Sequence, residues 1–290
     1  MALKNISVIG CGLMGHGIAQ VAAQGGYEVT VVEADASALD KGMKRIDGSL
    51  AKLVEKGKLT MEQATAVRSR LHPSTRVEDI SNSDLVIEAI VENLDVKKKL
   101  FVRLGEITNP NCILASNTSS FPVREMGEAS GRPAKMVGLH FFNPVQLMQL
   151  VEVVRTPKTD DVAFQESFAF GKQCGKSPVA AKDTPGFIVN RLLVPYLLEA
   201  IRMIERGDAT AADIDTAMRL GCGYPMGPVH LLDYVGLDTT QSIAEGWEQR
   251  YPQEQLFKVP QLLRKLVDEK RLGRKSGKGF YEWEGDKPKA

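Results

Sequence analysis

The stretch Gly10-Cys11-Gly12-Leu13-Met14-Gly15 decides the fold of this chain, because it has G-x-G-x-x-G spacing and directly follows the apolar run Ile6–Ile9. In a strand–turn–helix unit the first glycine permits a tight turn. The second lets the backbone approach a pyrophosphate, and the third allows the strand and the helix to pack closely. Amides at the start of the helix then face the phosphates. Such a motif is weak evidence alone, but here it has the strand–turn–helix context that a dinucleotide site requires.

A second signal follows about 20 residues after the glycine motif, where Glu33 ends the apolar run Val29–Val32. An acid at this point holds the ribose 2′-hydroxyl and repels a 2′-phosphate, so the sequence predicts NAD rather than NADP as the cofactor. Asp35 is an alternative ribose partner, two residues further into the loop. The competing interpretation is a structural turn with a surface carboxylate, which the context of the motif disfavours.

Apolar runs alternate with helical segments over the first 180 or so residues, which favours a parallel sheet covered on both faces. The strand-like runs are Ile6–Ile9, Val29–Val32, Leu85–Ala89, Cys112–Ala115, Met136–Phe141, Leu150–Val154 and Pro178–Ala181. The segment Ala36–Arg70 is charged and helix-periodic, with a break at Gly57–Thr60, and predicts an inserted helix pair. The fold class is therefore α/β: a Rossmann-like, doubly wound and mostly parallel sheet.

The strongest linker chemistry lies at Asp183-Thr184-Pro185-Gly186, because proline and glycine end regular structure and set a turn. Beyond it the pattern is almost wholly helical, over roughly Ile188–Glu205, Ala211–Leu220, Pro228–Val235, Thr239–Gln249 and Pro260–Lys270. We expect a Rossmann-like NAD-binding domain over residues 1–183 and an all-helical domain over residues 184–290.

Bulk composition excludes several classes of protein. The 290 residues are 43% hydrophobic and 25% charged, and the formal net charge of +1 favours neither a nucleic-acid surface nor a membrane anchor. The run Arg274–Tyr281 is basic, but its glycines favour a turn over a nucleic-acid-binding patch, since no wider basic surface accompanies it. The four cysteines show no CxxC pair and no metal-ligand spacing with the four histidines, so we expect reduced thiols and no metal. No apolar run approaches ~18 residues and the strand pattern starts by Ile6, so we expect a soluble cytoplasmic protein.

A candidate catalytic base lies in the segment Gly138-Leu139-His140-Phe141-Phe142-Asn143-Pro144. A carboxylate follows in the run Leu150-Val151-Glu152-Val153-Val154. The spacing suits the ends of two neighbouring strands, which would bring His140 and Glu152 together. An imidazole beside a buried carboxylate is a ready general base, since the carboxylate stabilises the imidazolium and fixes the tautomer. With the dinucleotide motif, this pair points to a hydride-transferring dehydrogenase. A satisfied core histidine and a surface glutamate are the competing interpretations.

Two further groups of polar residues follow predicted strands. Glu92 and Lys97 are candidates to contact the nicotinamide side of the cofactor, or else a helix-start carboxylate and part of a solvated lysine face. The segment Ser116-Asn117-Thr118-Ser119-Ser120 could hydrogen-bond a hydroxyl or a carbonyl, although such residues more often cap a helix. Because carboxyl ends of parallel strands share one edge, these groups are expected at the same crevice.

At this point the chain resembles the L-3-hydroxyacyl-CoA dehydrogenase family, particularly bacterial short-chain 3-hydroxybutyryl-CoA dehydrogenases, over essentially its whole length. The most specific segments are the one around His140 and Asp183–Arg191. The others are Gly10–Gln20, Asp84–Leu94, Ser116–Ser120, Leu150–Val153, Leu220–Leu237 and Leu272–Tyr281. Two positions depart from the family pattern. His16 stands where a small or uncharged residue is usual, and Gln146 stands where a second proline is common.

The resemblance implies that His140 is the general base, that Glu152 orients it, and that Ser119 and Asn190 are polar partners of the substrate. It implies that Ser49 and Lys56 on the inserted helices meet coenzyme A, although Lys56 could instead be a solvated lysine at a helix end. Contacts with NAD are implied for Gly10, Gly12, Leu13, Met14, Gly15, Glu33, Glu92, Lys97, Ser119, Asn143 and Lys275. A homodimer through the C-terminal helical domain is also implied.

The expected activity is the interconversion of a short (S)-3-hydroxyacyl-CoA and a 3-oxoacyl-CoA with NAD(H), in a cleft that uses both domains. One alternative is a related dehydrogenase that acts on a sugar acid or on a carrier-bound hydroxyacyl group. Another is a non-catalytic NAD-binding protein like the crystallin relatives of the family. Intact His140, Glu152, Ser119 and Asn190 favour catalysis. Acyl-chain length and pathway stay open at this point.

Overall fold

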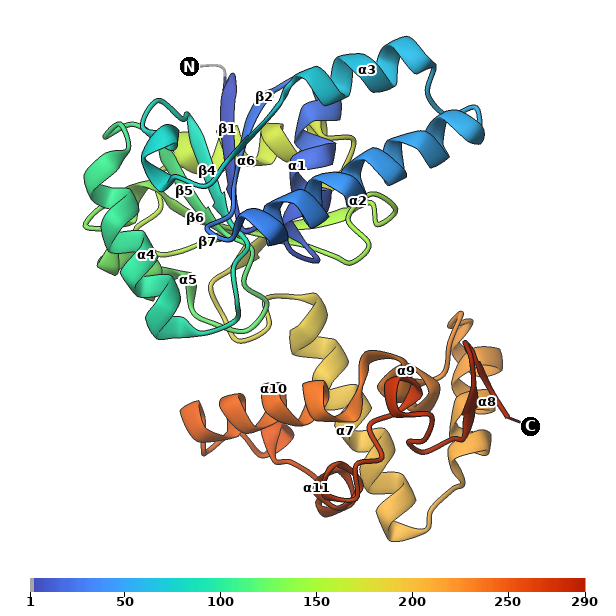
Figure 1. Ribbon diagram of the computed structural model, residues 1–290. Helices are drawn as coiled ribbons and strands as arrows, with labels where there is room; N and C mark the ends of the chain where they lie inside the picture. The colour runs from blue at the N-terminus through green and yellow to red at the C-terminus, as the bar shows by residue number, and fades with distance from the viewer. Residues whose placement is uncertain (1–2, 290) are drawn as a thin grey trace. The chain divides into compact units, whose positions relative to one another are not determined.

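The computed structural model describes residues 3–289, which divide into two compact units, one ending at Phe187 and the other beginning at Ile188. The first unit is built on an eight-stranded sheet with the order β3-β2-β1-β4-β5-β6-β7-β8 (Figure 1). Neighbouring strands are parallel except β6 and β7, which pair antiparallel. The strands are β1 (Asn5–Ile9), β2 (Glu28–Val32), β3 (Leu71–Ser74), β4 (Leu85–Glu88), β5 (Ile113–Ser116), β6 (Met136–Phe141), β7 (Leu150–Arg155) and β8 (Ser177–Lys182).

Helices cover both faces of this sheet, because alternate strand residues point into two separate cores. In β4, Leu85 and Ile87 join the core beneath α1 (Gly15–Gln24) and α6 (Asp161–Gln173). Parts of α2 (Ala36–Glu55) and α3 (Met61–Ser69) belong to the same core. Val86 joins the opposite core, beneath α4 (Leu94–Ile107) and α5 (Val123–Ala129). The predicted doubly wound, mostly parallel α/β fold is therefore confirmed.

The inserted helix pair consists of α2 (Ala36–Glu55) and α3 (Met61–Ser69), which extend from the sheet side by side (Figure 1). Asp35 begins α2 by accepting a hydrogen bond from the Ala38 amide at 2.7 Å. Thr60 begins α3 with a reciprocal capping box to Gln63. The edge strand β3 follows the pair and was not predicted, because its sequence Leu-His-Pro-Ser has no apolar alternation. Proline is tolerated there because an edge strand lacks one row of hydrogen bonds.

The second unit is helical, as the sequence predicts, with one addition. It contains α7 (Val189–Arg206), α8 (Ala211–Cys222), α9 (Pro228–Val235), α10 (Leu237–Arg250) and α11 (Gln261–Asp268). A hairpin of two short strands, β9 (Trp283–Glu284) and β10 (Lys287–Pro288), follows and was not predicted. Single 3₁₀ turns occur at Val77–Ile80, Pro133–Lys135, Gln255–Phe257 and Arg274–Ser276. Within residues 3–289, no helix is long and apolar enough to cross a membrane.

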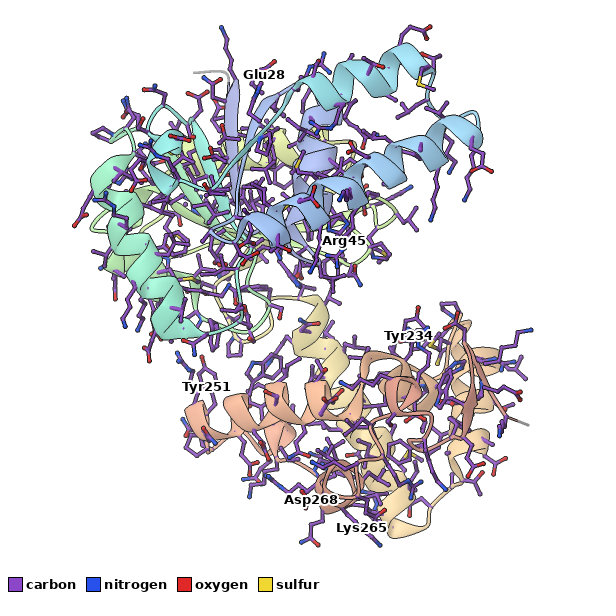
Figure 2. The ribbon with its side chains drawn as sticks, viewed as in Figure 1. Glu28, Arg45, Tyr234, Tyr251, Lys265 and Asp268 are labelled. Carbon is purple, nitrogen blue, oxygen red and sulfur yellow. The ribbon has the colours of Figure 1, made fainter. Side chains whose placement is uncertain are left out.

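A buried carboxylate fixes the C-terminal segment of the second unit. Asp233 is fully buried and accepts hydrogen bonds from the Phe280 amide, the Tyr281 amide and the Trp283 indole, each at 2.9 Å. The next residue, Tyr234, is labelled in Figure 2. The Arg274 guanidinium lies over the ring of Tyr234, and its central carbon is 4.2 Å from the centroid of that ring. The glycine-rich segment after α11 is thereby a folded turn with fixed partners.

Candidate active site

Five parallel strands bring polar residues to one edge of the sheet. The turn that contains the motif Gly10–Gly15, called the glycine turn below, follows β1, and Glu33 follows β2. Glu88 ends β4, Asn117 follows β5, and His140 lies near the end of β6. The strand order reverses direction between β1 and β4, because the chain builds outward from these two strands on both sides. Ligands of doubly wound proteins bind at the carboxyl edge beside such a switch point. This edge is therefore the candidate site.

Each of the three glycines in the motif is required for a different reason. Gly10 has φ +96°, and a β-carbon there would lie 2.5 Å from the Ala89 carbonyl oxygen. A β-carbon on Gly15 would lie 1.7 Å from the Gly10 carbonyl oxygen, so this glycine lets the turn close on itself. A β-carbon on Gly12 would meet nothing within 4 Å. The protein alone does not require glycine at position 12, but a closely approaching pyrophosphate does.

The rest of the turn also fits a dinucleotide. Helix α1 begins at Gly15, the last glycine of the turn, without an acidic residue in its first turn and without a side-chain cap at Met14. No acidic side chain of the first turn of α1 therefore competes with a phosphate, and the helix dipole favours an anion there. Glu33 accepts a hydrogen bond from the Cys11 amide at 3.1 Å, which holds its carboxylate beside the glycine turn. Asp35, the alternative ribose partner, is occupied as the cap of α2.

Glu92 is the centre of a polar cluster at the ends of β4 and β5. One carboxylate oxygen accepts from the Thr118 hydroxyl at 2.6 Å, the Ser119 amide at 3.2 Å and the Ser120 hydroxyl at 3.0 Å. The other lies 3.1 Å from Lys97 Nζ. Burial alone would raise the pKa of Glu92, but Lys97 and these hydrogen bonds outweigh burial and hold the pKa below its usual value. The solvated-lysine interpretation of Lys97 is wrong, since the side chain is 1% exposed.

His140 and Glu152 are brought together by the β6–β7 ladder, in which they are directly opposed residues. His140 Nδ1 lies 2.6 Å from Glu152 Oε2, and both residues are buried. The surface-charge interpretation of Glu152 is therefore wrong. When Glu152 is ionised it can only accept, so a neutral His140 facing it would carry its proton on Nδ1 and keep the lone pair of Nε2. This arrangement can supply a general base at the candidate edge.

Aromatic rings and an amide position the histidine. The ring centroid of His140 is 4.4 Å from that of Phe142 and 5.6 Å from that of Phe187. The Asn117 side chain accepts a hydrogen bond from the Phe141 amide at 2.9 Å, which ties the end of β6 to the end of β5. These contacts restrict the orientation of the imidazole and connect it to the turn that carries Ser119.

The remaining predicted site residues belong to neither the Glu92 cluster nor the His140–Glu152 pair. Asn143 is exposed in the loop after β6, and Ser49 lies in the last two turns of α2. Lys56 is exposed at the C-terminal cap of α2, where its lysine charge also suits the helix end. In the second unit, Asn190 lies in the first turn of α7, and Lys275 pairs with Asp238 at 2.5 Å.

The two positions that depart from the family pattern have local partners. His16 Nδ1 lies 2.7 Å from the Gly12 carbonyl oxygen, so its ring turns back onto the glycine turn. The Gln146 amide donates to Gln20 on α1 at 3.1 Å. Both side chains are therefore used in local structure around α1.

Sequence reasoning missed Glu88 as a support of the site, and it gave Ser116 and Asn117 as possible partners of a hydroxyl or a carbonyl rather than as supports. Glu88 is fully buried and accepts from Lys97 and from the Ser116 hydroxyl, each at 2.6 Å. One signal was available, since Glu88 is a charged residue at the end of an otherwise apolar buried strand. A charge in that position needs a partner, and Lys97 lies one helix turn into α4.

The doubly wound sheet and its glycine turn define a dinucleotide-binding oxidoreductase. Residues 5–184 match the NAD-binding domain of 3-hydroxyacyl-CoA dehydrogenases, and residues 186–283 match their C-terminal domain. The chain therefore belongs to the 3-hydroxyacyl-CoA dehydrogenase family. At the level of the family, the predicted dehydrogenase class and NAD cofactor are confirmed.

The similarity to known proteins covers nearly the whole chain. A probable 3-hydroxybutyryl-CoA dehydrogenase of Deinococcus radiodurans is 49% identical over 95% of this chain and 99% of its own length. The human mitochondrial hydroxyacyl-coenzyme A dehydrogenase is 50% identical over 97% of this chain and 91% of its own length. The crystal structure of (S)-3-hydroxybutyryl-CoA dehydrogenase from Ralstonia eutropha has a TM-score of 0.94 and 37% identity, with 97% of this chain and 99% of that chain covered.

Proposed function

We propose that this protein interconverts short (S)-3-hydroxyacyl-CoA esters and 3-oxoacyl-CoA esters with NAD(H). The observation that carries the proposal is the buried contact of 2.6 Å between His140 and Glu152, at the edge where the dinucleotide turn lies. A preference for short chains such as 3-hydroxybutyryl-CoA is supported by the names of the Deinococcus and Ralstonia relatives.

In the proposed reaction, His140 Nε2 accepts the proton of the substrate 3-hydroxyl. Glu152 keeps this nitrogen free by accepting the Nδ1 proton, and its charge stabilises the imidazolium that forms. Bound NAD would supply the acceptor for the hydride that leaves C3 of the substrate. In the reverse direction the same imidazolium returns its proton to the 3-oxo oxygen.

We assign the polar partners of the substrate to Ser119 and Asn190, and the coenzyme A contacts to Ser49 and Lys56. A lysine suits the phosphates of coenzyme A. NAD contacts are assigned to the glycine turn with Leu13 and Met14, and to Glu33, Glu92, Lys97, Ser119, Asn143 and Lys275. Glu33 and Glu92 are supported by their carboxylates facing the candidate edge, next to the Cys11 amide and the Ser119 amide.

We further propose that residues 1–183 form the NAD-binding domain, and that residues 184–290 form a domain for substrate binding and homodimerisation. Large apolar side chains on the second unit support an interface with a second copy. Leu192 is 70% exposed and Leu220 is 77% exposed, and Tyr224 is also exposed. Burial of such side chains favours association. Sedimentation of the wild type and of Leu192→Glu tests this: a monomeric wild type contradicts the dimer.

We place the protein in the cytoplasm and in fatty acid metabolism. The placement in the cytoplasm is supported by the cysteine chemistry, since all four thiols are free, and the placement in fatty acid metabolism is supported by the acyl-CoA substrate that the name of the family gives. Burial raises the pKa of Cys11 to about 11 and that of Cys112 and Cys174 to about 12, which keeps these thiols protonated. Free unreactive thiols suit a reducing compartment.

The decisive assay is NADH formation by the purified chain with a panel of substrates. The panel contains 3-hydroxybutyryl-CoA, longer 3-hydroxyacyl-CoA esters, free 3-hydroxybutyrate and a sugar acid, and His140→Gln is the inactive control. We expect turnover with the CoA esters, fastest for the short chain. Turnover of the free acid or the sugar acid alone, or of no substrate, overturns the proposal.

A further inference from the structure

The buried carboxylate of Glu88 has no role in the chemistry proposed above. Its side chain has no exposed surface, yet it accepts hydrogen bonds from Lys97 Nζ at 2.6 Å, the Ser116 hydroxyl at 2.6 Å and the Ile90 amide at 2.8 Å. A charge in the interior is costly unless it is paired and hydrogen-bonded. Lys97, itself 1% exposed, supplies the pairing charge.

Lys97 connects this interior carboxylate to the candidate site. Its ammonium lies 2.6 Å from Glu88 and 3.1 Å from Glu92, whose side chain is 40% exposed. Glu92 in turn receives hydrogen bonds from the Thr118 hydroxyl and the Ser119 amide. One ammonium thus sets the place of a partly exposed carboxylate, and that carboxylate sets the turn after β5.

A second connection reaches the same turn through the backbone. The Ser116 hydroxyl that donates to Glu88 also accepts from the Thr118 amide at 3.2 Å. The Asn117 amide donates to the Glu88 carbonyl oxygen at 2.8 Å. Residues 116–118 are therefore attached to Glu88 independently of the route through Lys97 and Glu92.

We infer that Glu88 is a positioning residue of the cofactor site, which fixes Lys97 and, by both routes, the orientation of Glu92 and of the turn that carries Ser119. The inference rests on the proposed function, in which Glu92, Lys97 and Ser119 contact NAD. Glu88 itself lies behind these residues and touches neither cofactor nor substrate.

The test is Glu88→Gln, which keeps the size of the side chain and removes its charge. Lys97 then loses its buried partner, and its ammonium is no longer held between two carboxylates. We expect the dissociation constant of NADH, measured by the fluorescence of the bound cofactor, to rise about tenfold, the size of effect typical of a lost hydrogen bond to a charged group. Binding is measured directly, so the result does not depend on turnover.

A double-mutant cycle separates positioning from general destabilisation. Thr118→Val removes the hydroxyl that donates to Glu92 and keeps the shape of the side chain. If Glu88 acts through this turn, the double variant Glu88→Gln/Thr118→Val binds NADH more tightly than the product of the two single losses requires. Simple loss of stability gives no such coupling in the dissociation constants of folded variants.

Lys98→Met is the matched control, since it breaks an ion pair on the same helix, where Lys98 lies 2.6 Å from Glu125. This pair is partly exposed, and we expect NADH binding to stay within about twofold of wild type. If Glu88→Gln does not fold, Ser116→Ala replaces it. Ser116→Ala keeps every charge, and we expect it to weaken NADH binding about threefold.

The outcomes are distinct. A folded Glu88→Gln protein with the NADH affinity of wild type overturns the inference, and so do independent effects in the cycle. Where only Ser116→Ala folds, unchanged affinity for NADH overturns it. A wild-type protein that fails to bind NADH contradicts the proposed function instead, so the two failures cannot be confused.

Discussion

The replacement Glu152→Gln tests the His–Glu pair most sharply, because it changes charge with little change in shape. Two unit charges about 4 Å apart at an effective dielectric constant of ~20 interact by about 4 kcal/mol. Each 1.36 kcal/mol corresponds to a factor of ten in rate, so losing this stabilisation of the imidazolium should lower kcat by about 10³-fold. The glutamine amide could also donate to Nδ1 of His140, which would move the imidazole proton to Nε2 and block the base.

The assay is steady-state NADH formation with 3-hydroxybutyryl-CoA, and the dissociation constant of NADH should stay at the wild-type value. Glu28→Gln is a matched control, since Glu28 also pairs with a histidine, His72, at 2.8 Å, but both side chains are more than half exposed. Glu28 lies at the opposite, amino-terminal end of its strand and is labelled in Figure 2. A folded Glu152→Gln enzyme with kcat within about threefold of wild type would refute the pairing.

Three further predictions concern the cofactor half. Gly12→Ala should melt like the wild type but bind NADH at least about tenfold more weakly, whereas Gly15→Ala should be unstable because its β-carbon would meet a carbonyl oxygen at 1.7 Å; the reverse pattern in melting and binding measurements would contradict this. Glu33→Ser should weaken NADH binding and improve NADPH binding, and an unchanged ratio of the two dissociation constants would count against ribose recognition. Although burial opposes it, Lys97 helps to lower the pKa of Glu92, so this carboxylate stabilises the fold above the ordinary carboxyl pKa of about 4.3 and stops doing so as the pH falls through the lowered value. The melting-temperature advantage of wild type over Glu92→Gln should therefore shrink on acidification, and a constant advantage would be inconsistent.

Much of the fold could be predicted because its signals are local. The glycine motif, the apolar strands and the charged insertion each occupy a continuous stretch of sequence. Their alternation predicts a doubly wound, mostly parallel sheet. The strand β3 and the final hairpin could not, because they are short and carry proline or little apolar alternation. Tertiary pairing makes them strands despite weak propensity.

The site residues also divide into those that the sequence can predict and those that only the structure brings together. His140 and Glu152 could be paired from sequence because both lie on neighbouring apolar runs, although their catalytic roles stay predictions. The partners that support the site come from distant segments and leave no periodic pattern. Asp183, for example, accepts from the Val123 and Arg124 amides at the start of α5, about sixty residues earlier in the chain. Polar complementarity of this kind is visible only in three dimensions.

The direct opposition of His140 and Glu152 across β6 and β7 has a consequence for variation of this chain. Their separation of twelve positions includes the connecting loop of residues 142–149, but the ladder alone sets their register. Insertions in that loop would keep the two side chains adjacent, whereas a slip of one residue within the strands would turn one of them to the other face. A search for distant proteins with the same pair should therefore require the strand pairing and let the interval between the two residues vary.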